Sequence, residues 1–460
     1  MIKINNPIIT LKRLIIFFFF YMILEGVIRK WVLPNFSNEI YFVKDIFLII
    51  IYTIALKYNL IFRLNYSKLF LVIIILISLY GFIGYEFSIK GIIYYIFGLR
   101  SYWIFLPLFL IITHVFSKND LIKFFKLNLY FIFPYFLLVY LQSSSPEKSV
   151  INSGFDGQLL SPERPSAYFT YTTQNTYYFL FLLFSLFSYV LDNNKFKSKD
   201  IIFICISNFL LFSIMILLKS RSVYFYTFFT VFYCTFFVII SKHQFNLKLI
   251  KVSLILLVSI ISFNISSKVV FEQEYKYSEK RMNTDWIDDY AIVNENEDLE
   301  LPFNFGIGGE KIKVKKFCSV NSTICRILND LYIIPAIKKS KLYGRGIGSG
   351  TKAVVALKNY RSFYLGEIDN KRIIMELGYI VGLLFVLTKW LFVIILNFYA
   401  IFKFRDENKI FYIPLLIFIS TQLMLGTISY TVSFISFIFW LSLGFLFSSF
   451  RKNNLREINN

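Results

Sequence analysis

Residues 200–241 read DIIFICISNFLLFSIMILLKSRSVYFYTFFTVFYCTFFVIIS, in which two apolar runs are joined only by Lys219, Ser220, Arg221 and Ser222. An α-helix needs roughly 20 apolar residues to cross about 30 Å of hydrocarbon, and both runs approach that length. The stretch therefore predicts two membrane-spanning helices, with two positive charges in the turn between them.

Apolar runs of this kind recur along the whole chain. Of its 460 residues, 57% are hydrophobic and 20% aromatic, which leaves too little polar surface for a soluble protein of this size. The first run is interrupted by Glu25 and Arg29, but it has no small-residue cleavage site, so we expect it to remain as a membrane helix. The runs fall near 14–28, 41–56, 69–85, 101–116, 127–142, 174–191, 200–218, 223–241, 249–265, 375–402, 410–426 and 432–449.

These runs predict an all-α integral membrane protein with about 12 transmembrane helices and one large periplasmic loop. Residues 1–265 form an N-terminal membrane bundle of about nine helices, and residues 266–371 form the large loop. Residues 372–460 hold about three C-terminal membrane helices and a short cytoplasmic tail. A loop of this length is expected to be partly folded or functional. The stretch 91–99 is a candidate for an interfacial or re-entrant segment.

The positive charges set the orientation of the helices. With the N-terminus in the cytoplasm, seven inner segments carry 21 Lys and Arg residues, whereas five short outer connectors carry eight. Lys and Arg concentrate on the cytoplasmic side of membrane proteins, so we predict cytoplasmic N- and C-termini. The same bias accounts for the net charge of +21, and we expect no nucleic-acid partner. Lys219 and Arg221 lie on the outer side, so orientation does not account for them.

Three outer arginines stand beside small or flexible residues: Arg164 in SPERPSAYF, Arg221 in KSRS and Arg345 in YGRGIGSG. The guanidinium fork binds two oxygens of a phosphate or pyrophosphate at once, and glycines let backbone N–H groups approach a ligand. We therefore predict that Arg164, Arg221 and Arg345 bind a pyrophosphate at the membrane surface. The alternatives are that Arg221 only reaches the lipid headgroups and that Arg345 lies in an ordinary surface turn.

Two carboxylates lie where the large loop returns to the membrane, in GEIDNKRIIMELGYIVG (366–382). An ionisable group at the edge of a span is a functional candidate, and a carboxylate can accept the proton of an attacking hydroxyl. Glu376 and Glu367 are therefore candidate catalytic bases. The alternative for Glu376 is a structural pair with Arg372, four residues earlier on the same helix face.

The sequence favours chemistry without a metal or another cofactor. Phosphate-cradling, G-x-S-x-G and H-E-x-x-H signatures are missing, and both histidines, His114 and His243, fall on the cytoplasmic side. Cys318 and Cys325 lie in the large loop without a nearby histidine, which makes a poor metal site. In an oxidising periplasm they either form a disulfide or remain thiols.

Three segments together resemble the O-antigen polymerase (Wzy-type) and O-antigen ligase superfamily of bacterial polytopic membrane proteins. RPSAYFTYTTQNTYYF resembles the R-x-(S/G)-x-F segment at a helix entry, and LLKSRSVYF resembles the S-R-(S/G) turn between two helices. GRGIGSG, followed by GEIDNKRIIMELGYIVG, resembles the late glycine cluster and the E-x-G-x-x-G re-entry. LEGVIRKWVLP (24–34) is similar to a further segment of such proteins. The motifs are loose, and the resemblance covers residues 90–430.

The resemblance implies metal-independent glycosyl transfer at the periplasmic face of the bacterial inner membrane. The function it favours is polymerisation of undecaprenyl-pyrophosphate-linked oligosaccharide repeat units into O-antigen or capsule. Its partners would be those lipid-linked glycans and the lipid bilayer, with a chain-length regulator as a further candidate. The ligase family usually has a histidine in a periplasmic loop, and its absence here favours a polymerase over a ligase that transfers polymer to lipid A core.

A repeat-unit transporter (flippase) is the second alternative. A transporter of this kind would need more charge buried at mid-membrane depth, whereas the charges of this sequence gather at the outer boundary of the predicted spans.

Overall fold

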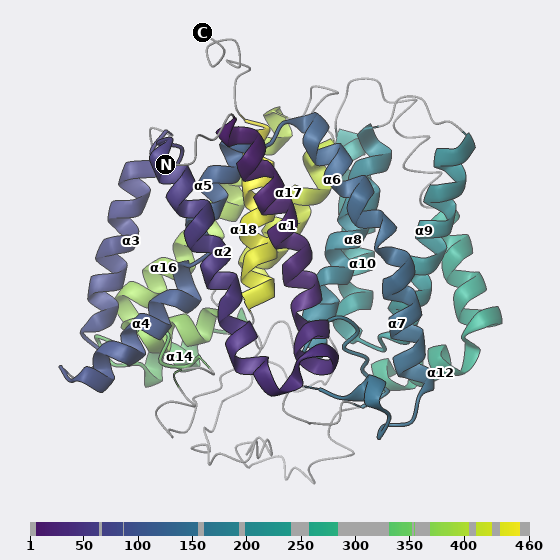
Figure 1. Cartoon of the computed structure of the whole chain (residues 1–460), viewed down its shortest axis with the longest axis horizontal. Coiled ribbons are helices and arrows are strands. Elements are labelled where there is room, and N and C mark those ends of the chain that lie inside the picture. The colour runs from purple at the N-terminus through teal and green to yellow at the C-terminus, as the bar shows by residue number, and fades with distance from the viewer. Residues whose placement is uncertain are drawn as a thin grey trace.

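The computed structural model gathers the helices of the chain into one bundle (Figure 1). It describes residues 6–63, 67–85, 87–154, 161–192, 198–240, 257–283, 331–351, 354, 369–403, 411–425 and 433–450, and every structural statement below concerns these residues. Helix α1 begins and helix α18 ends at the same end of the bundle, which we call the proximal end; the opposite end is the distal end.

The helices have the following bounds. They are α1 (Pro7–Val27), η1 (Ile28–Val32), η2 (Pro34–Phe36), α2 (Ser37–Lys57), α3 (Ser67–Phe82), α4 (Ile89–Trp103), α5 (Leu106–Val115), α6 (Lys118–Tyr130), α7 (Ile132–Ser144), η3 (Val150–Asn152), α8 (Thr172–Asp192), α9 (Ser198–Leu217), α10 (Arg221–Ile240), η5 (Ser266–Val270), α12 (Glu272–Asn283), α14 (Ile334–Lys339), α16 (Asp369–Lys403), α17 (Ile413–Leu425) and α18 (Ser433–Ser448).

The all-helical fold class is confirmed, and the described part of the chain holds no β-strand. The described residues of the twelve apolar runs lie mainly in helices. Five helical stretches are long and apolar enough to cross a membrane: Pro7–Val32, Ile89–Val115, Lys118–Ser144, Ser198–Leu217 and Asp369–Ala400. Four further apolar helices are shorter. The chain is thus a helical protein compatible with a bilayer.

Local signals explain where several helices begin. Asn6 caps α1 by accepting a hydrogen bond from the Ile9 N–H at 3.2 Å, and Pro7 occupies the first turn. Ser117 caps α6 in a reciprocal capping box. Pro107 lies at the start of α5, where the run from Ile89 to Val115 is interrupted at 104–105. The stretch 91–99 lies within α4, so it belongs to a membrane-length helical run.

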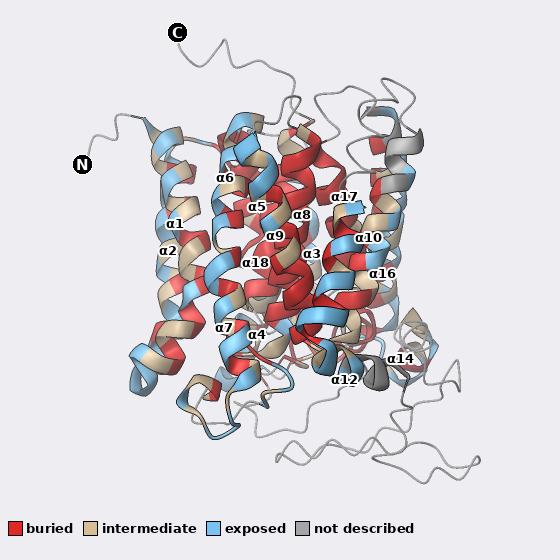
Figure 2. Ribbon diagram, turned by 90° about the vertical axis from the view of Figure 1, so that its right-hand side faces the viewer, coloured by how far each residue is buried: buried red, intermediate tan, exposed pale blue. Residues whose placement is uncertain are grey.

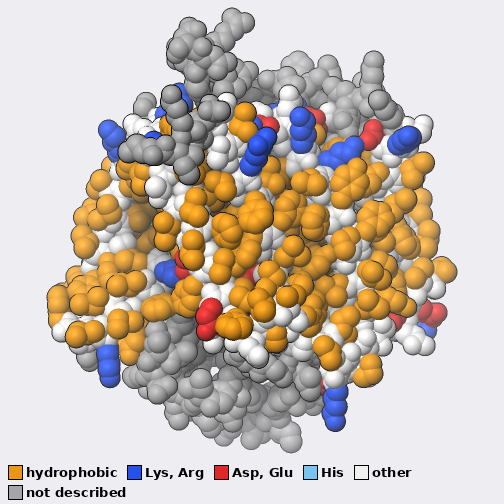
Figure 3. All heavy atoms as spheres, in the orientation of Figure 1, with side chains coloured by type: hydrophobic (Ala, Val, Ile, Leu, Met, Phe, Trp, Pro, Cys, Tyr) orange, Lys and Arg blue, Asp and Glu red, His pale blue; other side chains and the backbone are white. Residues whose placement is uncertain are grey.

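Aromatic side chains fill the middle of the bundle. Helices α5, α8, α17 and α18 are buried along most of their length and form the red centre of Figure 2. Phe437 of α18 meets Phe18 of α1 edge-on, with ring centroids 5.1 Å apart, and edge-to-face contacts of this kind favour one fixed packing. By contrast, Ile49, Leu76 and Leu391 on the peripheral helices are more than half exposed. Such side chains form the apolar belt of Figure 3, as a lipid-facing surface would require.

Gly378 divides α16 into two helices that fold back on each other. Its φ of 81° and ψ of 168° belong to a region that is essentially open only to glycine. Lys389 Nζ donates to Asn370 Oδ1 at 2.9 Å although the two residues are 19 positions apart. A straight helix would separate them by about 28 Å. Residues 369–377 therefore run back beside the turns that follow Gly378, and the single helix expected over 375–402 is corrected to a helical hairpin.

Candidate functional site at the distal end

The segments that carry the sequence motifs all lie at the distal end of the bundle. Residues 28–36 join α1 to α2, residues 161–171 precede α8, and residues 218–220 join α9 to α10 (Figure 1). The glycine-rich turn, residues 344–350, follows α14 at the same end. Segments that are far apart in sequence therefore share one end of the molecule, and the contacts below join them in two pairs.

The first pair joins the α1–α2 turn to the segment that carries Arg164. A Cβ at Gly26 would lie 2.1 Å from the carbonyl oxygen of Tyr168, so only glycine allows this approach. Lys30 Nζ donates to Ser166 Oγ at 3.0 Å and to the Ala167 carbonyl at 2.7 Å. These contacts hold 166–168 firmly, while Arg164 itself is exposed just before them.

The second pair joins the glycine-rich turn to Glu376, which is fully buried. Glu376 Oε2 accepts hydrogen bonds from the Tyr102 hydroxyl and from the Gly348 N–H at 2.9 Å. Oε1 accepts from the Gly350 N–H at 2.9 Å and lies 3.5 Å from Arg372 Nε. These hydrogen bonds offset the free-energy cost of burying the carboxylate. Glu376 therefore anchors the turn to α4 and α16.

This geometry bears on the role predicted for Glu376. A base that accepts the proton of a sugar hydroxyl needs an oxygen that faces the substrate. Both oxygens of Glu376 already accept from protein donors, and the Arg372 contact is the structural pair considered as the alternative. The geometry therefore favours a positioning role, and the catalytic role of Glu376 stays a prediction.

The glycine-rich turn is also pressed against α3 and α4. A Cβ at Gly84 would lie 2.1 Å from the Gly346 nitrogen, and one at Gly98 would lie 2.0 Å from the Ile347 carbonyl oxygen. The Tyr85 hydroxyl donates to that same carbonyl at 2.6 Å. Backbone therefore meets backbone along this contact, which explains why glycines recur on both sides of it.

Arg345 is half-buried on the glycine-rich turn. Its backbone N–H donates to the Met375 carbonyl at 3.0 Å, directly before Glu376. The structure thus brings two predicted site residues, Arg345 and Glu376, into one unit at the distal end.

Residues 218–220, between the two apolar runs quoted first, form a tight turn between α9 and α10. Lys219 has a φ of 48°, and the Ser220 carbonyl accepts hydrogen bonds from the N–H groups of Val223 and Tyr224. The Lys219 ammonium lies 5.1 Å from the centre of the Tyr277 ring, so one of the two charges contacts α12 through a cation–π interaction. Arg221 opens α10 and is half-buried.

The other predicted residues are placed as follows. Arg164 lies on the segment before α8 and Arg221 at the first residue of α10, both at the distal end. Glu367, Cys318 and Cys325 lie outside the described residues. The described part of the chain contains no group of three or more His, Cys, Asp and Glu residues arranged to hold a metal ion.

Sequence reasoning missed a buried ionic network between α1, α2 and α4. Glu25 Oε1 lies 3.2 Å from Arg29 Nη1 and 3.1 Å from Lys44 Nζ. Arg100 donates two hydrogen bonds to the Asp45 carboxylate, from Nε at 2.9 Å and from Nη2 at 3.1 Å. The available signal was the set of charges inside apolar runs, where ionisable residues mark functional candidates.

The fold and this charged end define an all-helical protein with helices of membrane-spanning length. Comparison with protein-family models, curated proteins and solved structures found no match for the chain. The distal-end geometry and the sequence motifs therefore carry the functional argument.

Proposed function

We propose that the chain polymerises undecaprenyl-pyrophosphate-linked oligosaccharide repeat units at the periplasmic face of the bacterial inner membrane. The observation that carries the proposal is the meeting of the motif segments at the distal end, where Glu376 fixes the turn bearing Arg345. Arg164 precedes α8 and Arg221 begins α10 at that same end. Arginines on rigid turns suit a leaving pyrophosphate, because fixed cations stabilise developing negative charge.

The proposed reaction is a displacement at the anomeric carbon of the growing chain. A hydroxyl of the incoming lipid-linked unit attacks that carbon, and the bond to undecaprenyl pyrophosphate breaks. Arg221, with Arg164 and Arg345, stabilises the departing pyrophosphate. Glu376 also positions the glycine-rich turn, and the hydroxyl proton passes to a carboxylate, for which Glu376 and Glu367 are the candidates.

The proposed topology has about 12 spans, with the distal end and residues 266–371 in the periplasm and both termini in the cytoplasm. What supports it is the coincidence of the twelve apolar runs with helices and the concentration of Lys and Arg in the proximal connectors. The expected partners are lipid-linked glycans and the bilayer, with a chain-length regulator as a further candidate.

The test is the surface polysaccharide of a strain that lacks the gene and is complemented with wild type, Arg221→Ala or Arg221→Lys. A polymerase predicts a ladder with wild type and a single repeat unit with both variants, because lysine cannot replace the planar fork. Lys12→Ala on the proximal side serves as the matched control. Long polymer that remains unattached to core in the deletion strain would identify a ligase instead.

One observation favours the transporter as a second candidate. The sequence placed the charges at the boundary, but the structure buries Glu25, Lys44 and Lys389 within the bundle. Helix α2 begins at Ser37, and Asp45 lies about 12 Å further along it. Asp45 is therefore well inside the helix and not at its end. Repeat units that accumulate on the cytoplasmic side of the deletion strain would support the transporter and contradict the polymerase.

A further inference from the structure

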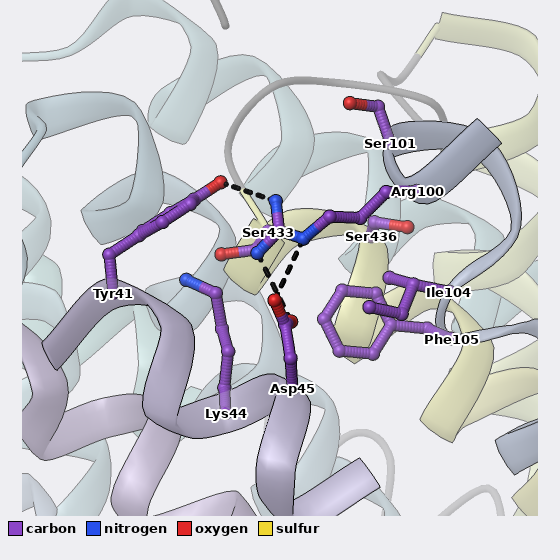
Figure 4. Close-up of a pocket in the computed structure, with 9 residues that line it drawn as sticks. All are labelled: Tyr41, Lys44, Asp45, Arg100, Ser101, Ile104, Phe105, Ser433 and Ser436. Atoms are coloured by element: carbon purple, nitrogen blue, oxygen red, sulfur yellow. Dashed lines mark hydrogen bonds and ion pairs between the residues drawn. The ribbon is translucent and has the colours of Figure 1, made fainter. Parts of the chain in front are cut away.

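A small pocket opens between α2, α4 and α18 (Figure 4). Its enclosed space of about 10 Å³ is roughly the room of one water molecule or one phosphate oxygen. Ile104 and Phe105 form its apolar side. Its polar lining consists of Tyr41, Lys44, Asp45, Arg100, Ser101, Ser433 and Ser436.

The charges that line this pocket do not balance. Lys44 and Arg100 are cations, whereas Asp45 is the single carboxylate of the lining. Glu25, on the other side of Lys44, is shared with Arg29. Excess positive charge is costly inside a bundle of apolar helices, so the lining favours an anion as an additional partner.

The hydrogen-bond donors of the pocket point to the same ligand. Ser436 Oγ is buried and has no hydrogen-bond partner in the described structure. The Tyr41 hydroxyl accepts from Arg100 Nη1 at 3.0 Å and keeps its own proton to donate. Lys44 Nζ lies 3.5 Å from the centre of the Tyr41 ring, toward which it is turned in Figure 4, and it donates to Glu25. Two cations and two hydroxyls thus belong to the lining of one small pocket.

The pocket is reached from the apolar belt. The side chains of Arg100 and Asp45 are 16% and 21% exposed, so the pair is partly open to the surface of the bundle. Phe42 and Ile46 on α2 and Ile96 on α4 are exposed nearby. A ligand that enters here carries an anionic group on an apolar chain.

We propose that this pocket binds a phosphate oxygen of a lipid that lies against α2 and α4. At this depth a phosphate loses headgroup water, so it binds only where fixed cations and hydroxyls replace that water. The pocket shares α4 with the glycine-rich turn, but its proposed ligand does not depend on the reaction proposed for the distal end.

The test is native mass spectrometry of the full-length protein in detergent, titrated with dioctanoyl phosphatidic acid. Dioctanoylglycerol is the matched lipid without phosphate, and inorganic phosphate is the anion without a lipid. Ser436→Ala removes one donor and should weaken phosphatidic acid binding about tenfold, the usual effect of a lost hydrogen bond to a charged group. Ser442→Ala is the matched control, because Ser442 is equally buried on α18 and does not line the pocket.

A second variant keeps the test decisive. The double substitution Arg100→Gln with Asp45→Asn removes the pair together, so neither charge is left buried alone, and should abolish selective binding. Wild-type affinity in both Ser436→Ala and the double variant, or equal binding of dioctanoylglycerol, would overturn the proposal. Inorganic phosphate that binds as well as phosphatidic acid would overturn its assignment to a lipid.

Discussion

The carboxylate of Glu376 is held by two backbone N–H groups, the Tyr102 hydroxyl and the nearby Arg372 guanidinium. A fully buried carboxylate with this many donors fixes the shape of the turn that it binds. The position of Arg345 at the distal end therefore depends on a side chain that has no need to touch a substrate.

Replacing Glu376 with glutamine should release the glycine-rich turn. The new NH2 group faces an N–H donor of the turn, and we expect a cost of about 2–3 kcal/mol in the free energy of unfolding. Ser349 is buried, so Ser349→Cys should be protected from maleimide in wild type and labelled in Glu376→Gln. The four native cysteines are replaced by serine for this measurement. Glu39→Gln, at an exposed position, is the control, and equal protection in all three proteins would refute the anchor.

The glycines opposite the turn allow a second prediction for single residues. Gly98→Ala would place a Cβ 2.0 Å from the Ile347 carbonyl oxygen. The backbone of α4 or of the glycine-rich turn would then have to move. We expect the free energy of unfolding to fall by about 3 kcal/mol or more, which is measured as a lower unfolding temperature in detergent. An unchanged unfolding temperature would mean that the turn does not pack against α4.

At the scale of elements, the helical hairpin in α16 decides what enters the bundle. Residues 369–377 return toward the interior and bring Asn370 beside Lys389 and the Met424 carbonyl of α17. Asn370→Cys and Lys389→Cys should therefore cross-link within one chain as a disulfide under oxidation with copper phenanthroline, which reaches positions inside the bundle. Leu391→Cys paired with Asn370→Cys is the control, because Leu391 is exposed on the peripheral face. Cross-linking of neither pair would support the straight helix instead.

Most of the helices could be predicted from the sequence, because an apolar run of membrane length has few other stable forms. The hairpin could not, since the pattern of 375–402 is continuous and Gly378 alone marks the break. That glycine is needed because a Cβ there would lie 2.0 Å from the Leu342 carbonyl oxygen, a contact between segments distant in sequence.

Prediction of the candidate site had the same limit, because contacts between segments distant in sequence cannot be read from local motifs. Arg164, Arg221, Arg345 and Glu376 could be proposed as site residues because each stands in a recognisable local motif. Lys44 and Arg100 were missed because Lys44 lies within a predicted apolar run, Arg100 lies at the edge of one, and each gains its partner only when α1, α2 and α4 pack together.

For the whole molecule, the account predicts that the proximal and distal ends face opposite sides of the membrane. Ser161 at the distal end and Ser117 at the proximal end are both exposed. In intact cells, an impermeant thiol reagent should label Ser161→Cys and spare Ser117→Cys. The native cysteines are again replaced by serine. The reverse labelling pattern would place the motif segments in the cytoplasm and remove the basis for a periplasmic enzyme.

The most direct test of the central claim uses the purified full-length protein in liposomes with a lipid-linked repeat unit. The account predicts products of increasing length together with released undecaprenyl pyrophosphate, and a loss of both with Arg221→Ala but not with Lys12→Ala. Transfer of the lipid-linked unit between leaflets without any elongation would contradict the account and identify a transporter.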